Sequence, residues 1–222
     1  MKHNILLAVT MVLVASNLFC YRNGSGDNNN NGYMAETYIN TLPFEEISEV
    51  EKEGLLRIRE EEKLARDVYR VLYDRWGLRI FDNISRSEQK HMDAVKTLLI
   101  KYGMADPVTD DTTGNFTDPE LLKLYEQLIA KGNLSITDAL YVGATIEDVD
   151  IFDIQNYQLQ ADNMDILFVF GNLKKGSENH IRAFTGQLSS YNIEYKAQFI
   201  TQEELEAILS SDSGNGRGRG RG

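Results

Sequence analysis

The stretch Ser85-Arg86-Ser87-Glu88-Gln89-Lys90-His91-Met92-Asp93-Ala94-Val95-Lys96-Thr97-Leu98 decides the fold. Its apolar residues recur at the spacing of an α-helix that buries one face. Glu88 and His91 are neighbours on that apolar face, so we expect both side chains to point into the interior. Ser85 and Glu88 also match the Ser-x-x-Glu capping box, which predicts a helix that begins near Ser85 and stops at Gly103.

Further stretches share this helical periodicity. They are residues 44–76, 118–131, 136–157, 163–191 and 201–209. The chain of 222 residues has three prolines and 42% apolar residues, which favours a helical domain with a buried core over a turn-rich β-fold. We expect 118–131 to be a crossover helix and 201–209 to pack outside the four main helices. The predicted fold class is therefore all-α.

Acidic and histidine side chains also fall on the apolar faces of the other predicted helices. Glu147 shares its face with Leu140 and Ile151, Asp150 lies one turn further on, and His180 has apolar neighbours at helical spacing. Each residue alone is explained as a hydrogen-bonded core group. Together they indicate a metal site, because a buried carboxylate is costly unless it is paired or coordinates a metal, and helical bundles build carboxylate-bridged dimetal sites from such residues.

The two ends of the chain have a different composition. Residues 1–20 have a basic start, an apolar run and a small or polar exit, which is the pattern of a secretory signal. The residues around Cys20 resemble a bacterial lipoprotein processing site, from which Phe19 departs. Residues 21–36 are expected to be a disordered polar linker, and 211–222 a disordered Gly/Arg tail. These features predict an exported protein of the periplasm or cell surface, attached to the membrane only through a lipidated Cys20 or a signal anchor.

Charge and cysteine content exclude some functions. The net charge of −11 argues against a nucleic-acid partner, because phosphate binding needs a basic surface. The single cysteine leaves no intramolecular disulfide and no Cys-x-x-Cys pair for a built-in electron-transfer module.

One motif on the first helix resembles a known superfamily. Glu62-Lys63-Leu64-Ala65-Arg66-Asp67-Val68-Tyr69 is similar to the Glu-x-x-Ala-Arg-x-x-Tyr of the rubrerythrin branch of ferritin-like proteins. With 87–95, 138–144 and 176–184 it resembles a narrower family, a ferritin-like domain of unknown function that is often found on exported lipoproteins. The resemblance implies a ferritin-like four-helix bundle over residues 37–210, with a long crossover that contains the extra helix.

The resemblance also implies roles for individual residues. It implies that Glu62 is a terminal ligand and that Glu88 bridges two metals. It also implies that His91 binds the first metal, and that Glu147 and His180 bind the second. Periodicity keeps Glu61 open as a rival to Glu62, because Glu61 shares its face with several apolar residues.

The fourth helix departs from the superfamily pattern. Ser177 stands where a second bridging glutamate is expected, and Glu178 is turned toward basic residues and solvent. Asp150 is a candidate replacement for the missing carboxylate. Without it, a single-metal site is an alternative to a dinuclear one, because two close divalent ions need anionic bridges.

These observations predict a metal-binding protein of the cell envelope that oxidises or sequesters ferrous iron. Imidazole and carboxylate ligands suit iron, manganese or zinc, and the resemblance favours iron. Catalysis, if present, would be that of a ferroxidase-like oxidoreductase. The alternative is a non-catalytic ferritin-like module that acts as a binding scaffold. A homodimer is compatible with the sequence.

Overall fold

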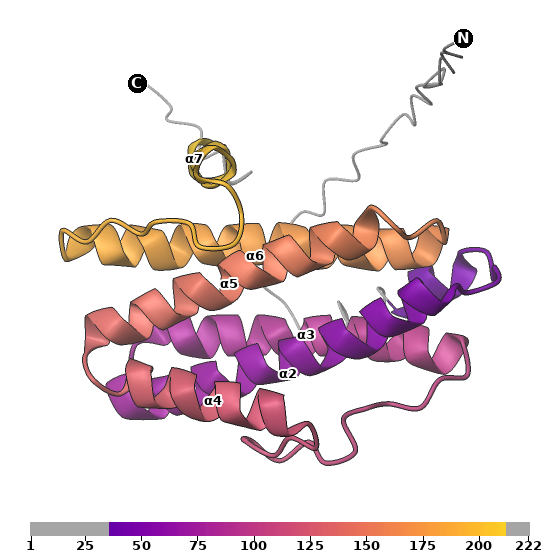
Figure 1. Ribbon diagram of the computed structural model, residues 1–222, viewed down its shortest axis with the longest axis horizontal. Helices are drawn as coiled ribbons and strands as arrows, with labels where there is room; N and C mark the ends of the chain where they lie inside the picture. The colour runs from indigo at the N-terminus through magenta and orange to yellow at the C-terminus, as the bar shows by residue number, and fades with distance from the viewer. Residues whose placement is uncertain (1–35, 212–222) are drawn as a thin grey trace, which may run out of the picture.

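The computed structural model describes residues 36–211, which form an all-α structure (Figure 1). Residues 36–41 are helical, and the helices that follow are α2 (Glu49–Trp76), α3 (Arg79–Lys101), α4 (Pro119–Gly132), α5 (Ile136–Gln158), α6 (Met164–Ser190) and α7 (Gln202–Ser210). The all-α prediction is confirmed. The predicted signal and most of the linker and tail, 1–35 and 212–222, lie outside the described residues.

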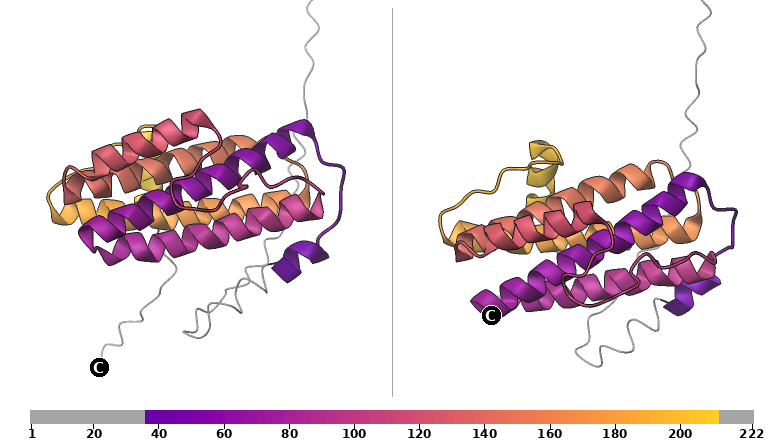
Figure 2. Two further views of the ribbon diagram at one scale, coloured as in Figure 1. Left: turned by 90° about the horizontal axis from the view of Figure 1, so that it is seen from below. Right: turned by 60° about the horizontal axis from the view of Figure 1, so that its bottom comes forward.

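Four long helices lie side by side in two pairs (Figures 1 and 2). α2 packs on α3 and α5 packs on α6, while α2 also contacts α5 and α3 contacts α6. The long connection from α3 to α5 carries α4 across the outside of α2 and α5. α7 contacts α6 and projects away from the other helices (Figure 1). None of the helices in the described part of the chain combines the length and apolarity of a membrane span.

Two helix starts differ from the prediction. α2 begins at Glu49 rather than near Phe44, because Ser48 forms a capping box with Glu51. α3 begins at Arg79, six residues before the predicted Ser85, since one left-handed glycine, Gly77 with φ 68°, is enough to end α2.

The capping box predicted at Ser85 is therefore wrong. The Ser85 hydroxyl lies inside α3 and donates a hydrogen bond to the Asp82 carbonyl at 3.0 Å. Glu88 is fully buried and caps nothing, because it faces the centre of the helices.

A polar layer divides the core into two apolar clusters. On α2, Leu55 and Ile58 belong to one cluster, and residues from Leu64 to Leu72 belong to the other, with Glu61 and Glu62 between them. On α3 and α6, too, one end belongs to each cluster, and the charged or polar inward residues lie between the two. The apolar clusters therefore exclude water from both ends of the polar layer.

The long connection is attached to α2 through buried charges. Asp67 accepts hydrogen bonds from Lys63 Nζ at 2.6 Å and from Arg66 Nη2 at 2.8 Å. Lys63 then donates to the Thr112 carbonyl, and Arg66 donates to the Asp111 carboxylate at 2.7 Å. Because both cations are buried, this network fixes the loop before α4 against the middle of α2.

The segment that leads to α7 has its own buried anchor. Asp148 on α5 is fully buried and accepts hydrogen bonds from the Tyr195 hydroxyl at 2.7 Å and from the backbone amides of Gln198 at 2.6 Å and Ile200 at 2.9 Å. This carboxylate therefore holds the segment 195–200, which leads into α7, against α5.

Candidate metal centre

Five residues from the four long helices meet in the polar layer. α3 supplies Glu88 and His91, which are three residues apart and so share one face. α2 supplies Glu62, α5 supplies Glu147 and α6 supplies His180. The three carboxylates are at most 1% exposed, and both imidazole side chains are 11% exposed. The structure thus brings together all five residues for which the sequence predicts a ligand role by resemblance.

The first half of the centre is formed by Glu62, Glu88 and His91. His91 Nδ1 lies 3.0 Å from Glu62 Oε2 and 2.7 Å from Glu88 Oε2. Potential ligand atoms of the three residues all lie within 4.8 Å of one another, which is close enough for all three to hold one ion.

The second half repeats this arrangement with Glu88, Glu147 and His180. His180 Nδ1 lies 2.8 Å from Glu88 Oε1 and 3.2 Å from Glu147 Oε2, and potential ligand atoms of the group again lie within 4.8 Å of one another. Glu88 thus directs one oxygen to each histidine. The two imidazole rings are nearly parallel, with centroids 5.6 Å apart and an interplanar angle of 25°.

The Glu88 carboxylate is paired with two imidazoles. Both of its oxygens are fully buried, and each lies at hydrogen-bond distance from a different ring nitrogen, Oε2 from His91 Nδ1 and Oε1 from His180 Nδ1. A buried carboxylate is costly unless it is paired or coordinates a metal, and the two histidines supply the pairing when no ion is present.

Tyr69 positions Glu147. Its hydroxyl donates a hydrogen bond of 2.5 Å to Glu147 Oε1, which leaves Oε2 directed at His180. Tyr69 is fully buried, and burial together with Glu147 raises the pKa of its phenol well above the usual value, so the phenol keeps its proton. Arg66 and Asp67, on the same helix, bind the loop before α4 instead of a residue of the centre.

Protons occupy this centre when no ion is present. Burial would lower the pKa of His180, but Glu88 and Glu147 outweigh it and raise that pKa to about 10. Burial raises the pKa of Glu62 to about 8 despite the opposing effect of His91. Burial would raise the pKa of Glu88, but the positive charges of His180 and His91 outweigh burial and lower that pKa well below the usual range. An ion that binds here must therefore displace protons from imidazole nitrogens.

Asp150 and Glu61 occupy other positions. Asp150 is buried, and burial together with the charges of Glu62 and Glu147 raises its pKa well above the usual value. It belongs to neither of the two groups described above, and its Oδ2 has no hydrogen-bond partner among the described residues. Glu61, the rival to Glu62, also lies outside both groups and instead pairs with Arg57 at 2.5 Å.

The fourth helix contains no second bridging carboxylate near His180. Ser177 is buried and its hydroxyl donates to the Leu173 carbonyl of its own helix at 3.3 Å. Glu178 is partly exposed and pairs with Lys174 at 3.4 Å. The turn of Glu178 toward basic residues agrees with the sequence prediction.

Gly176 was not among the predicted site residues, although it packs against the centre. A Cβ at this position would lie 2.5 Å from His91 Nε2 and 2.6 Å from His91 Cε1. The absence of a side chain on α6 thus leaves room for the imidazole from α3. No sequence pattern signals this contact, because it depends on how closely α3 and α6 approach.

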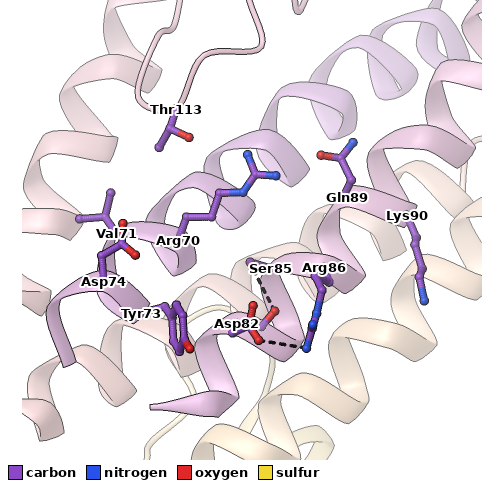
Figure 3. A pocket seen from close by; sticks show the side chains of 10 residues that line it. All are labelled: Arg70, Val71, Tyr73, Asp74, Asp82, Ser85, Arg86, Gln89, Lys90 and Thr113. Atoms are coloured by element: carbon purple, nitrogen blue, oxygen red, sulfur yellow. Dashed lines mark hydrogen bonds and ion pairs between the residues drawn. The ribbon is translucent and has the colours of Figure 1, made fainter. Parts of the chain in front are cut away.

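A surface cavity lies apart from this centre. It has a volume of about 520 Å³ and opens between α2 and α3 (Figure 3). Its lining residues are Arg70, Val71, Tyr73, Asp74, Asp82, Ser85, Arg86, Gln89, Lys90 and Thr113. None of these residues belongs to either half of the metal centre, so the cavity is separate from it.

Comparison with known proteins identifies the family. The chain is 55% identical over 176 residues to a protein of Methanocaldococcus jannaschii named "Uncharacterized protein MJ0754", covering 79% of this chain and 95% of the relative. A crystal structure titled as hypothetical protein MJ0754 from Methanococcus jannaschii superimposes with a TM-score of 0.76, covering 78% of this chain and 98% of that one. Residues 51–212 match the model of an uncharacterized protein domain, DUF2202. The chain therefore belongs to the DUF2202 family.

Proposed function

We propose that this protein binds two divalent metal ions, iron above all, inside a ferritin-like four-helix bundle, and that it oxidises or sequesters ferrous iron. The two antiparallel pairs α2/α3 and α5/α6, joined by a long crossover, support the ferritin-like assignment. Buried Glu and His groups that can hold a metal ion support the binding assignment.

The observation that carries the proposal is the environment of Glu88. Its two buried oxygens pair with different imidazoles, one at 2.7 Å and the other at 2.8 Å. A carboxylate in this position can bridge two ions, and bridging anions are what two close divalent ions require.

The roles of the residues follow from their contacts. Glu62 and His91 would hold one ion, Glu147 and His180 the other, and Glu88 both. Iron held in this way supplies redox chemistry with oxygen or peroxide. Tyr69 keeps its proton on the hydroxyl that contacts Glu147 Oε1, so Glu147 Oε2 is left for an ion. The apolar clusters on either side limit access of water.

The first test is the metal content of the purified protein and of His91→Ala and His180→Ala. We expect about two ions per chain in the unaltered protein and about one in each variant, since each histidine serves one half of the centre. Asn179→Ala, an exposed neighbour of His180, is the control and should keep both ions. If neither histidine variant changes the metal content, the ligand assignment is wrong.

The same protein tests for catalysis. Ferrous iron is added in air, and the amount that remains is followed with a ferrous-specific chelator. Loss of ferrous iron faster than in buffer, and slower in both histidine variants, supports oxidation. Metal binding without faster oxidation would leave a non-catalytic binding module, which is the alternative function.

A glycine substitution tests how α6 supports the centre. In Gly176→Ala the new methyl group would overlap the His91 imidazole, so that ring must move away from Glu62 and Glu88. We expect the affinity of the first ion to fall about 10–100-fold, as when a group that orients a ligand is lost. Gly186→Ala on the same helix is the matched control, because its methyl group meets no atom within 4 Å. Equal metal titrations of the two variants would contradict the prediction.

The cellular location is part of the same proposal. Export to the envelope through residues 1–20, with or without lipidation at Cys20, would place the protein where it meets iron outside the cytoplasm. Residues 1–20 lie outside the described part of the chain.

A further inference from the structure

A row of acidic side chains follows the contact between α2 and α5. Two contacts set the register of these helices: the Tyr157 ring packs on Gly54, and the Tyr69 hydroxyl bonds to Glu147. Because the helices are antiparallel, rising residue numbers on α2 face falling numbers on α5. Between the two contacts this register brings Glu61 of α2 opposite the part of α5 that carries Asp150 and Asp153.

The residues of this row become steadily more buried toward the metal centre. Asp153 is half-buried and interacts with Glu61, whose side chain is 10% exposed. Asp150 is 4% exposed and lies close enough to Glu61, and to Glu62 and Glu147 of the metal centre, for their charges to raise its pKa together with burial. The row therefore joins the surface to the centre through carboxylates alone.

One oxygen of this row has no hydrogen-bond partner among the described residues. It is Asp150 Oδ2, which is buried, whereas Glu61 interacts with Arg57 and with Asp153. A buried polar atom without a partner is costly. A divalent cation would satisfy it, because carboxylate oxygens are ligands that such cations take.

Arg57 stands at the outer end of the row. Its Nε donates to Glu61 Oε1 at 2.5 Å, while its side chain is 42% exposed. The charges of Glu61 and Asp153 both favour its protonated form. The flexible guanidinium therefore occupies the position that an incoming cation would reach first, and it can move into solvent when displaced.

The histidine side of the centre offers a less favourable approach for cations. Both imidazole side chains are slightly exposed there, between α3 and α6. The exposed charged residues within two positions of His91 and Gly176 are Lys90, Asp93 and Lys175, so lysines outnumber acids there. The positive charges of the lysines disfavour the approach of a cation, in contrast to the acidic row.

We propose that the row Asp153–Glu61–Asp150 conducts divalent cations from solvent to the metal centre, and that the incoming ion displaces Arg57 from Glu61. This inference rests on the proposed function, because it needs a metal centre at the inner end. It concerns the rate of uptake, whereas the ligands of the centre determine how much metal is held.

The test is stopped-flow uptake of Co²⁺ by the purified protein at low ionic strength. Co²⁺ is a suitable probe, since sites with nitrogen and oxygen ligands bind it at least as tightly as Fe²⁺, and its visible absorption reports binding. We expect Asp153→Asn to slow uptake about threefold or more, and Arg57→Gln to accelerate it, with the final Co²⁺ content unchanged in both. The differences should shrink as salt is added.

Glu203→Gln is the matched control for Asp153→Asn. It removes the same charge at an exposed position of α7, which packs on α6. Equal uptake rates of Asp153→Asn and Glu203→Gln would overturn the proposed route. A lower final Co²⁺ content with an unchanged rate would overturn it too, since Asp153 would then act in holding metal. No uptake by the unaltered protein would overturn both the route and the proposed function.

Discussion

Glu88→Gln is expected to abolish binding of both ions, which is a larger loss than either histidine variant causes. The substitution keeps the size of the side chain but removes the only carboxylate shared by the two halves of the centre. An amide has one oxygen and no charge, so it cannot bridge two ions that repel each other. We expect the metal affinity to fall more than about 100-fold. This exceeds the effect of losing a residue that only hydrogen-bonds a ligand.

The measurement is metal per chain after dialysis, combined with circular dichroism to verify that the helices remain. Glu178→Gln is the matched control: the same change of residue type, on α6 close to His180, at a side chain that pairs with Lys174 and takes no part in the centre. It should keep both ions. A Glu88→Gln protein that still binds two ions would exclude Glu88 as a bridge and with it the dinuclear assignment.

Asp67→Ala is expected to cause the largest loss of stability. The carboxylate pairs with Lys63 and Arg66, whose side chains are at most 2% exposed, so its removal leaves two buried cations with too few partners. Breaking a buried ion pair from one side typically costs about 3–5 kcal/mol. The free energy of unfolding, measured in urea, should fall by about that amount.

Two further variants separate charge from packing. Asp74→Ala, an exposed aspartate on the same helix, should change the unfolding free energy by less than about 0.5 kcal/mol. The double variant Lys63→Met with Asp67→Leu should recover part of the loss, because apolar residues of similar volume can replace a buried pair. If Asp67→Ala costs no more than Asp74→Ala, the network does not hold the crossover loop.

Much of the candidate centre could be predicted from local pattern. Glu88 and His91 lie three residues apart on one apolar face, and Glu147 and His180 also have apolar neighbours at helical spacing. Helical periodicity alone directs such side chains inward, because the helix must bury its apolar face. The ligand roles, and the choice of Glu62, came from the resemblance, and the packing of the four helices brings the five residues to one level.

Helix starts were less predictable, because several residues can compete to begin a helix. Ser85 has the pattern of a cap, yet α3 has already begun at Arg79, and Glu88 is required in the interior. Ser48 caps the start of α2, because both hydrogen bonds of its capping box form there. A local motif specifies what a residue can bond to, while the tertiary structure selects which bond is made.

By itself the sequence determined the all-α class and the inward faces of the helices, because both follow from helical period and burial. Its resemblance to rubrerythrin-like proteins implied the set of residues available for a metal. Only the tertiary structure decided between Glu61 and Glu62. These neighbours lie about 100° apart around α2, which packs on two other helices, so both can be buried. The packing turns Glu62 toward His91 of α3, and Glu61 toward Asp153 of α5. Periodicity along one helix carries no information about which neighbour each face will meet.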